Sequence, residues 1–399
     1  MIGWAFVFNN HLTEIGVDGS AQGELAESFE ASPDAAIWTV RLREGVEFHN
    51  GKTVTASDVI ASLNHHRGDD STSAAKPLVE PIVDMEALDD RTVRFTLSGG
   101  NADFPFIVSD YHLVIMPAVD GVMDWRSGVG CGPYVIDSFE PGVRALAKRH
   151  ANYWKSDRAH FDEIEFLSII DAAARTNALT TGEIDAMDRV DLKTVPLLKR
   201  GPSINVHSVN GNQHYTFAMR TDTAPFTDNN VRLALKHGLD REAMLQTILR
   251  GYGAVGNDHP IGQGDQFFAA DLEQRTYDPD KAKFHLREAG MDSLAVDLSV
   301  ADAAFAGAVD AGVLYSEHAA AAGIDINVVR EPNDGYWSNV WLNKPWCAVY
   351  WGGRPTADLM FTTAYAAEAS WNDTFWDNER FNELLVQARA ELDQPLRAD

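Results

Sequence analysis

The sequence predicts an α/β protein of two or three domains. Its 399 residues exceed the ~250–300 at which one hydrophobic core usually stops growing. Residues 296–328 follow a strand–helix–strand pattern, which is typical of a parallel strand pair with a right-handed crossover. The first third of the chain instead alternates short strands with turns around one helix.

Composition disfavours some classes of partner, and the sequence shows no membrane span or signal peptide. The chain has 33 Lys and Arg against 59 Asp and Glu, a net charge of −26, which disfavours nucleic acid and anionic lipid as partners. No stretch approaches the ~18 apolar residues of a membrane span. The apolar residues 1–8 lack the basic leader and cleavage site of a signal peptide. Cys131 and Cys347 show no metal-site spacing, so we expect buried free thiols, with one disulfide as the alternative.

Alternation and capping signals place the elements of the first third. Trp38, Val40 and Leu42 alternate with polar residues, which predicts a half-buried strand. Residues 93–97 repeat that pattern. Thr55 and Asp58 have the spacing of a capping box, so a helix is expected to begin there.

The middle third mixes strands with one helix. A turn at residues 130–134 leads into a predicted strand at 134–139, and Ile164 and Phe166 begin another. Residues 172–181 are expected to be helical, with Gly182 as the C-terminal cap.

The last third alternates helix and strand. Val231, Ala234, Leu235 and Leu239 fall on one face of a predicted helix. Asp240 is expected to cap a second helix, and Asp278 followed by Pro279 opens a third. The strand–helix–strand unit follows, with strands at 296–300 and 324–328 around a helix at 303–322, and residues 348–351 are the next strand.

The end of that last strand carries the features of a binding pocket. Six of the ten tryptophans lie between residues 337 and 376, and Trp351 is followed by Gly352, Gly353 and Arg354. Glycine lets the backbone approach a ligand, tryptophan offers apolar faces, and arginine binds carboxylates and phosphates. In open α/β sheets, ligands bind outside the carboxyl ends of strands. The alternative is that the tryptophans are core residues and that Arg354 pairs with a local acid.

Cofactor and catalytic motifs are weak or missing. Residues 251–256 match the dinucleotide-binding letters but follow a helix instead of a strand, so a turn is the better interpretation. We found no phosphate-binding loop, metal motif or nucleophile elbow, and therefore expect no cofactor and no metal. Asp358 and Asp373 leave a glycoside hydrolase open, which would need a defined carboxyl separation and one raised pKa.

An ordered set of segments resembles a known family, the periplasmic substrate-binding proteins of bacterial ABC importers, in the dipeptide, oligopeptide and nickel-binding group (solute-binding protein family 5). Each segment is weak alone, but the set follows the family's order over nearly the whole chain. The segments are residues 24–30, 38–51, 55–59, 130–134, 152–154, 182–185, 225–232, 239–242 and 277–283.

The resemblance implies a type II periplasmic binding fold, with two α/β lobes around a cleft and an extra subdomain on the first lobe. It implies the subdomain at residues 1–117, lobe one at 118–222 and lobe two at 223–399. Relative to the family, an N-terminal strand and a C-terminal return segment are expected to be missing from this chain. It further implies a monomeric, non-enzymatic protein of the periplasm, or one anchored outside the cytoplasm, that closes on its ligand and delivers it to a membrane permease and its ATPase.

The resemblance also suggests where the ligand binds. Arg354 facing the cleft would favour a ligand with a carboxylate or phosphate, and Asp358 facing it would favour an amine. The leading hypothesis is capture of a peptide-like or other small organic, possibly anionic, solute. The alternatives are a hydrolase that uses Asp358 and Asp373, or a ligand sensor without import. The candidate contacts are Trp351, Gly353, Arg354, Asp358, Trp371, Asn372, Tyr111, His112 and Asn10.

Overall fold

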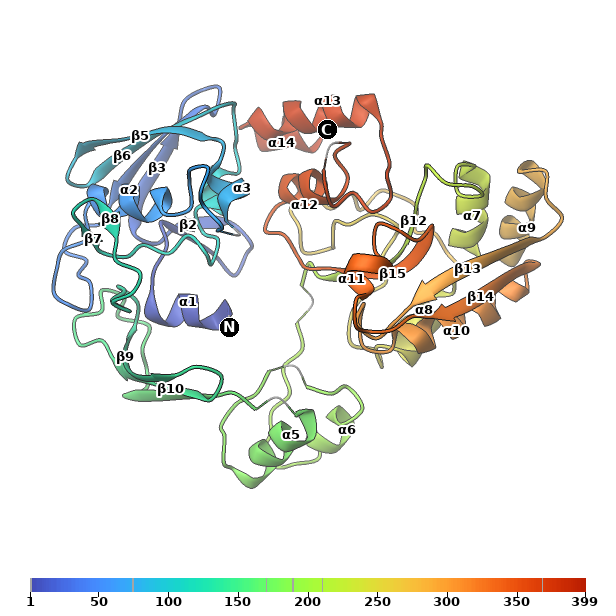
Figure 1. The fold of residues 1–399 in the computed structure, drawn as a ribbon, viewed down its shortest axis with the longest axis horizontal. Helices are drawn as coiled ribbons and strands as arrows, with labels where there is room; N and C mark the ends of the chain where they lie inside the picture. The colour runs from blue at the N-terminus through green and yellow to red at the C-terminus, as the bar shows by residue number, and fades with distance from the viewer. Residues whose placement is uncertain (1, 74, 170, 189, 210, 368) are drawn as a thin grey trace. The chain divides into compact units, whose positions relative to one another are not determined.

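The computed structural model describes residues 2–73, 75–169, 171–188, 190–209, 211–367 and 369–399. Contacts between residues divide the chain into two compact units (Figure 1). Unit 1 comprises Met1–Ala174 and Val386–Asp399, and unit 2 comprises Arg175–Leu385. The division expected from the sequence, with subdomain and lobes at 1–117, 118–222 and 223–399, stays a prediction.

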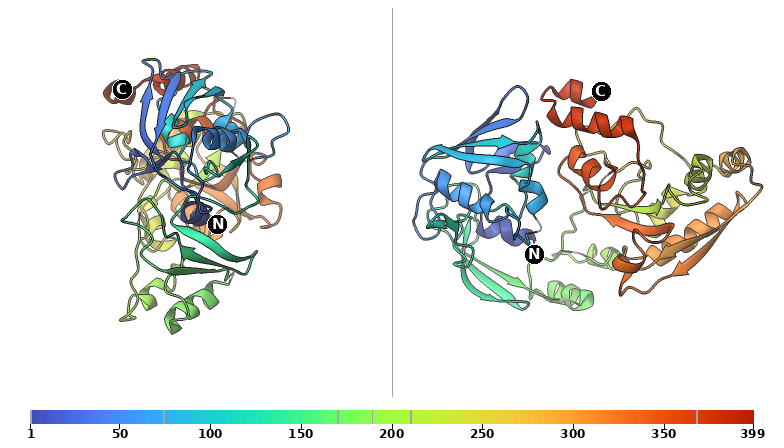
Figure 2. Two further views of the ribbon diagram at one scale, coloured as in Figure 1. Left: turned by 90° about the vertical axis from the view of Figure 1, so that its left-hand side faces the viewer. Right: turned by 45° about the horizontal axis from the view of Figure 1, so that its top comes forward.

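Unit 1 is built around an antiparallel sheet with strand order β3-β4-β6-β5. The predicted alternation is confirmed in β4 (Ile37–Leu42), where Trp38, Val40 and Leu42 are buried. The helix α2 (Ala56–Asn64) begins with the predicted capping box and packs against this sheet (Figure 2). The other strands of the sheet are β3 (Ala26–Ala31), β6 (Thr92–Leu97) and β5 (Ile82–Asp89).

A second antiparallel sheet of unit 1 has the order β11-β10-β9. Its strands are β9 (Tyr134–Glu140), β10 (Arg144–Arg149) and β11 (Glu163–Leu167), of which the first and last were predicted. Phe8 of the first helix packs with Tyr134 in a small core beside this sheet. The remaining elements of the unit are α1 (Ile2–Phe8), β1 (Thr13–Ile15), β2 (Ala21–Gly23), α3 (Lys76–Val79), α4 (Phe104–Ile107), β7 (Ala118–Val119) and β8 (Val122–Met123).

A four-stranded mixed sheet with the order β12-β15-β13-β14 forms the centre of unit 2. The predicted strand–helix–strand unit is confirmed, because β13 (Leu294–Val300) and β14 (Ile324–Arg330) are parallel and flank α10 (Ala308–Ala320). The strand β12 (His214–Met219) pairs antiparallel with β15 (Trp346–Trp351).

Helices pack against this sheet and bury the side chain of Trp346 on β15. Trp346 is 1% exposed, and its ring packs against those of Phe226 and of Tyr315 on α10. The predicted helices α7 (Asn229–His237) and α9 (Pro279–Glu288) pack against each other. The remaining helices of unit 2 are α6 (Val195–Leu198), α8 (Arg241–Thr247), α11 (Tyr336–Asn339) and α12 (Ala357–Ala364). The helices α5 (Ala172–Thr181) and α13 (Glu379–Ala390) cross the boundary between the units, and α14 (Gln394–Ala398) belongs to unit 1.

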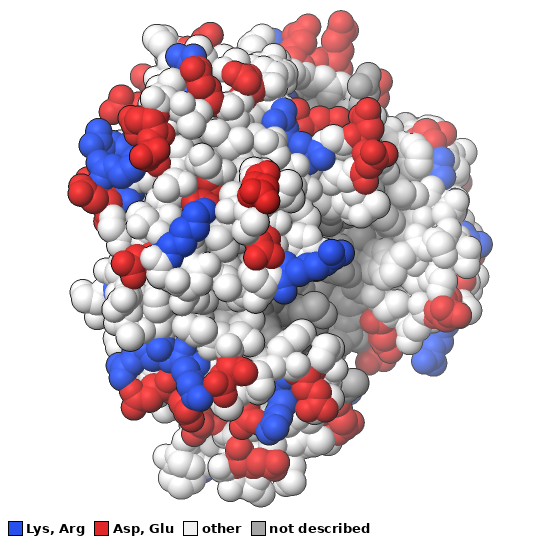
Figure 3. Space-filling model, turned by 60° about the vertical axis from the view of Figure 1, so that its left-hand side comes forward, with Lys and Arg blue, Asp and Glu red and all other residues white. Residues whose placement is uncertain are grey.

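Several smaller expectations can be compared with the structure. Cys131 and Cys347 are buried free thiols, as predicted. Residues 251–256 form a turn and loop with no helix after them, which confirms the interpretation of that motif. Among the described residues, no helix has the length and apolar character needed to cross a membrane. On the face shown in Figure 3, acidic and basic side chains are interspersed.

A buried ion pair fastens the end of the chain within unit 1. Arg397 donates from Nη1 and Nη2 to the two carboxylate oxygens of Asp103, at 2.6 and 2.7 Å. The two side chains are 4% and 1% exposed. Such a pair is costly to break, because removal of one partner leaves the other charge buried without compensation.

We therefore expect Arg397→Ala to lower the free energy of unfolding by about 3–5 kcal/mol, the usual cost of breaking a buried pair. The matched control is Arg380→Ala, since Arg380 pairs with Glu383 and both side chains are more than half exposed; its cost should stay below about 1 kcal/mol. Urea unfolding measures both. Equal effects of the two variants would show that the Arg397 pair does not hold the terminus.

Candidate functional site

The candidate site is built on the end of β15 and the loop that leads to α12. Trp351 is the last residue of the strand and lies opposite His214 in the register with β12. Thr356 ends the loop, and its side chain caps α12 by accepting a hydrogen bond from the backbone N–H of Leu359 at 3.2 Å. Both ends of the loop are thus fixed by regular structure.

Gly353 is needed for close packing inside unit 2. A Cβ atom on this residue would lie 2.9 Å from Cβ of Asn212 and 3.1 Å from its backbone carbon. Asn212 also donates from Nδ2 to the carbonyl oxygen of Arg354 at 3.1 Å. The absence of a side chain at Gly353 is therefore explained by Asn212, whereas the sequence had suggested close approach to a ligand.

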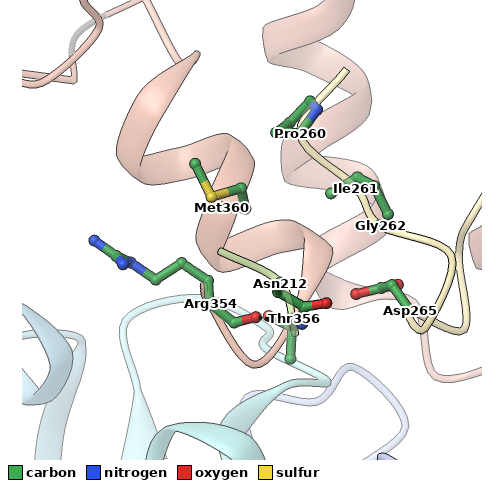
Figure 4. A pocket seen from close by; sticks show the side chains of 8 residues that line it. All are labelled: Asn212, Pro260, Ile261, Gly262, Asp265, Arg354, Thr356 and Met360. Carbon is green, nitrogen blue, oxygen red and sulfur yellow. Dashed lines mark hydrogen bonds between the residues drawn. The ribbon is translucent and has the colours of Figure 1, made fainter. Parts of the chain in front are cut away.

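The guanidinium of Arg354 stays available for a ligand. Its Nη1 donates to the carbonyl oxygens of Gly352 and Gly353, at 3.0 and 3.5 Å, and no carboxylate among the described residues forms an ion pair with it. The local acid that the alternative interpretation required is thus not found in the described part of the chain. Figure 4 shows the Arg354 side chain extending away from Asp265.

A small pocket lies beside the loop. It encloses about 200 Å³, including space open to solvent, so the space enclosed by protein alone is smaller still. A pocket of this size can hold only part of a ligand. The lining residues, shown in Figure 4, are Asn212, Pro260, Ile261, Gly262, Asp265, Arg354, Thr356 and Met360; of these, the sequence had singled out Arg354.

Three indole rings pack together next to the strand end, and we call Trp341, Trp351 and Trp371 the tryptophan cluster. The ring centroids of Trp341 lie 6.3 Å from those of Trp351 and 5.9 Å from those of Trp371. Trp351 is only 4% exposed, whereas Trp371 is 48% exposed. The ring that the cluster offers to solvent is therefore Trp371, and Trp351 supports it from within the core.

Asp373 is hydrogen-bonded to two side chains of the tryptophan cluster. Its Oδ2 accepts hydrogen bonds from Nε1 of Trp341 and Nε1 of Trp351, both at 3.2 Å. Burial raises the pKa of the Asp373 carboxyl to about 6, although the two indole hydrogen bonds oppose the rise. The sequence had suggested Asp373 as a hydrolytic carboxylate, and this contact with the two indoles was not predicted.

The raised pKa meets one condition of the hydrolase hypothesis, but the surroundings of both carboxylates oppose it. Asp373 is 4% exposed and Asp358 is 7% exposed, and Asp358 accepts a hydrogen bond from Thr362 at 3.4 Å. A general acid or base must come within hydrogen-bond reach of its substrate. Neither carboxylate is exposed for such a contact in this structure, and a role of Asp358 in ligand binding stays a prediction.

Asn372 has a structural role in the same loop. It is 5% exposed, and its Nδ2 donates to the carbonyl oxygens of Ala366 and Trp376, at 3.3 and 2.8 Å. These bonds hold the loop that carries Trp371 in place. Asn372 is better described as an anchor of the loop than as a surface contact.

The three candidates from the first part of the chain lie in unit 1. Asn10 is 1% exposed; its amide donates to Glu24 at 2.6 Å and accepts from Trp154 at 3.1 Å, so its polar atoms serve the core. His112 interacts with Asp110 at 2.7 Å and its ring lies 3.9 Å from that of Tyr111. Tyr111 and His112 are partly exposed and stay predictions.

We expect Gly353→Ala to destabilise the protein by about 1–3 kcal/mol, the usual cost of an added methyl group in a closely packed position. Gly352→Ala is the matched control, because the nearest atom to its new Cβ would be Nη1 of Arg354 at 3.7 Å. Thermal or urea unfolding separates the two. A Gly353→Ala variant as stable as Gly352→Ala would contradict the close approach of Asn212.

The stability of the protein should depend on the ionisation of Asp373. A carboxyl pKa raised from the ordinary 3.8 to about 6 gives a stabilising contribution that is complete below pH 3.8 and lost as the pH rises through 6. The loss is about 3 kcal/mol. Relative to Asp373→Asn, the wild type should therefore lose stability between pH 4 and 7.5 in urea unfolding. If the free energies of unfolding of the two proteins changed with pH in parallel, the pKa of Asp373 would not be raised in the folded protein.

The chain matches known proteins over most of its length. Residues 20–373 match the family model described as bacterial extracellular solute-binding proteins, family 5. Heme-binding protein A of Haemophilus influenzae is 28% identical over 292 residues, covering 67% of this chain and 53% of that protein. Glutathione-binding protein GsiB of Escherichia coli K12 is 30% identical over 272 residues, covering 67% and 52%. The chain thus spans about half the length of these curated relatives.

Solved structures agree on the fold. HbpA2 from Haemophilus parasuis superposes with a TM-score of 0.86 at 22% identity, covering 99% of this chain and 84% of that one. NikA from Brucella suis, in complex with Fe(III)-EDTA, gives a TM-score of 0.85 at 19% identity, covering 100% and 85%. These likenesses confirm the predicted two-lobed α/β periplasmic-binding fold. Since the family model spans nearly the whole chain, this protein belongs to the family 5 extracellular solute-binding proteins of bacteria.

Proposed function

We propose that this chain captures a small organic solute that carries an anionic group, and delivers it unchanged to an ABC permease and its ATPase in the membrane. Membership of family 5 supports the transport role. Named relatives bind haem and glutathione. Solved structures of similar fold hold agropinic acid in one case and the peptide STSA in another. Carboxylate groups are common to several of these solutes.

One observation carries the choice of an anionic ligand: the Arg354 guanidinium has no carboxylate partner among the described residues and bonds only to two backbone carbonyls. Guanidinium groups recognise carboxylates with two parallel hydrogen bonds. Arg354 follows a buried strand, and Gly353 beside it packs closely on Asn212, which supports a preorganised contact of this kind. Preorganisation of this kind reduces the entropy lost on binding.

The exposed ring of Trp371 provides the apolar part of the proposed contact. Large aromatic side chains contribute much of the energy of binding at protein surfaces. The small pocket beside the Arg354 loop would take only one end of the solute. We propose that hinged closure of the two lobes buries the rest, a recognised mode of ligand capture.

We propose that the protein binds the solute without catalysing a reaction on it. The carboxylates near the loop are buried and hydrogen-bonded, so the solute would leave as it entered. A monomer outside the cytoplasm is the arrangement that we propose for such a carrier.

The test is calorimetry of the full chain against glutathione, a dipeptide, an opine, a sugar acid and haem. At least one carboxylate-bearing solute should bind saturably. Arg354→Ala should weaken that binding about 10- to 100-fold, the effect of losing a hydrogen bond to a charged group, with little change in melting temperature.

Arg380→Ala is the matched control, since Arg380 lies on α13 and pairs with Glu383; it should bind like the wild type. Binding that survives Arg354→Ala unchanged would contradict the anionic contact. A folded protein that binds no member of the panel would require a different ligand class.

A further inference from the structure

In the described structure, Asp373 is the shared acceptor for two indole N–H groups, those of buried Trp351 and partly buried Trp341. An indole has one donor and no acceptor, so the only polar atoms of Trp341 and Trp351 both depend on Oδ2 of this carboxylate. If that acceptor were lost, one buried and one partly buried donor would be left without this partner, and the cost in free energy would be larger for the buried N–H of Trp351.

The loop that carries Asp373 is anchored independently of the indoles. Asn372 bonds across the loop to Ala366 and Trp376, and the carbonyl oxygen of Thr374 accepts from the backbone N–H of Thr221 at 2.8 Å. Trp371, the exposed ring of the cluster, lies two residues earlier in the same loop. The loop therefore holds the exposed ring and the acceptor in one fixed relation.

We propose that Asp373 is a positioning residue for the ligand-contacting surface of unit 2. By binding both indole N–H groups, it fixes Trp341 and Trp351 behind Trp371 and so sets the face that Trp371 offers to a solute. This inference rests on the proposed function, because it takes the tryptophan cluster to be a ligand contact.

The positioning of the indoles by Asp373 should depend on whether its carboxyl group is charged, because of the groups that surround it. Two other titratable groups are electrostatically coupled to it, the Cys347 thiol on β15 and the Tyr365 hydroxyl at the end of α12. Burial raises the pKa of Cys347 to about 12 and the pKa of Tyr365 above its usual range, so both stay neutral near pH 7. No cation among the described residues contributes to the pKa of Asp373.

Without a compensating charge nearby, protonation of Asp373 weakens the acceptor that both indoles share. A charged acceptor forms a stronger hydrogen bond than a neutral one. The packing of the cluster should therefore loosen as the pH falls through the pKa of this carboxyl, which is about 6. The asymmetric environment of the indoles makes this loosening visible in near-ultraviolet circular dichroism.

The test follows near-ultraviolet circular dichroism of the ligand-free full chain from pH 4 to pH 8. The wild type should show a transition with a midpoint near pH 6. Trp351→Phe removes one hydrogen bond that favours the charged carboxyl, so its midpoint should move upward by about one pH unit. Asp373→Asn should abolish the transition.

Trp337→Phe is the matched control. The Trp337 ring lies 5.8 Å from that of Trp341, but the described structure gives it no hydrogen bond to Asp373, so its midpoint should equal that of the wild type. A midpoint shift in this variant as large as that of Trp351→Phe would show that loss of an indole beside the cluster, and not loss of the hydrogen bond to Asp373, moves the midpoint.

Two results would overturn the inference: equal midpoints for Trp351→Phe and the wild type, or a transition that persists in Asp373→Asn. If Asp373→Asn does not fold, the midpoints of Trp351→Phe and Trp337→Phe still test whether the hydrogen bond to Asp373 sets the transition. Since no ligand is needed, the result is separate from the test of function. Shifted midpoints in a protein that binds no solute would uphold the fixing of the indoles and refute the proposed function.

Discussion

The burial of β15 in the sheet of unit 2 is the constraint on which the candidate site depends. Five of its six residues are buried, and it pairs with β12 on one side and β13 on the other. A strand held in this way cannot shift without disrupting the core. The loop after Trp351 therefore starts from a fixed point, and the positions of Arg354 and α12 follow from it.

The same constraint explains how polar groups come to lie in an apolar part of the protein. Trp351 brings its N–H into the core at the strand end, and a buried donor needs an acceptor. Asp373 supplies one, and its carboxyl is kept at a raised pKa by the same burial. The tryptophan cluster is thus a compromise, because the packing that fixes the indoles also makes their partner sensitive to protons.

Much of the fold could be predicted from local pattern. Three elements could be predicted from short stretches of sequence, and each is confirmed: the alternation in β4, the capping box of α2 and the parallel strand pair around α10. Residues of the site were harder to assign, because their roles depend on contacts between distant segments. The need for glycine at position 353 comes from its contact with Asn212, which lies more than a hundred residues earlier in the chain. A local sequence pattern does not indicate such a contact. Likewise, the sequence clusters the tryptophans but does not say that Trp371 is exposed and Trp351 buried.

The central claim is that the Arg354 loop and the tryptophan cluster contact the solute. The most direct measurement is a crystal structure of the full chain with a carboxylate-bearing solute from the calorimetry panel. We expect electron density for a carboxylate within hydrogen-bonding distance of the Arg354 guanidinium, and for the body of the solute against the ring of Trp371. A solute bound in full occupancy elsewhere, with both side chains untouched, would contradict it.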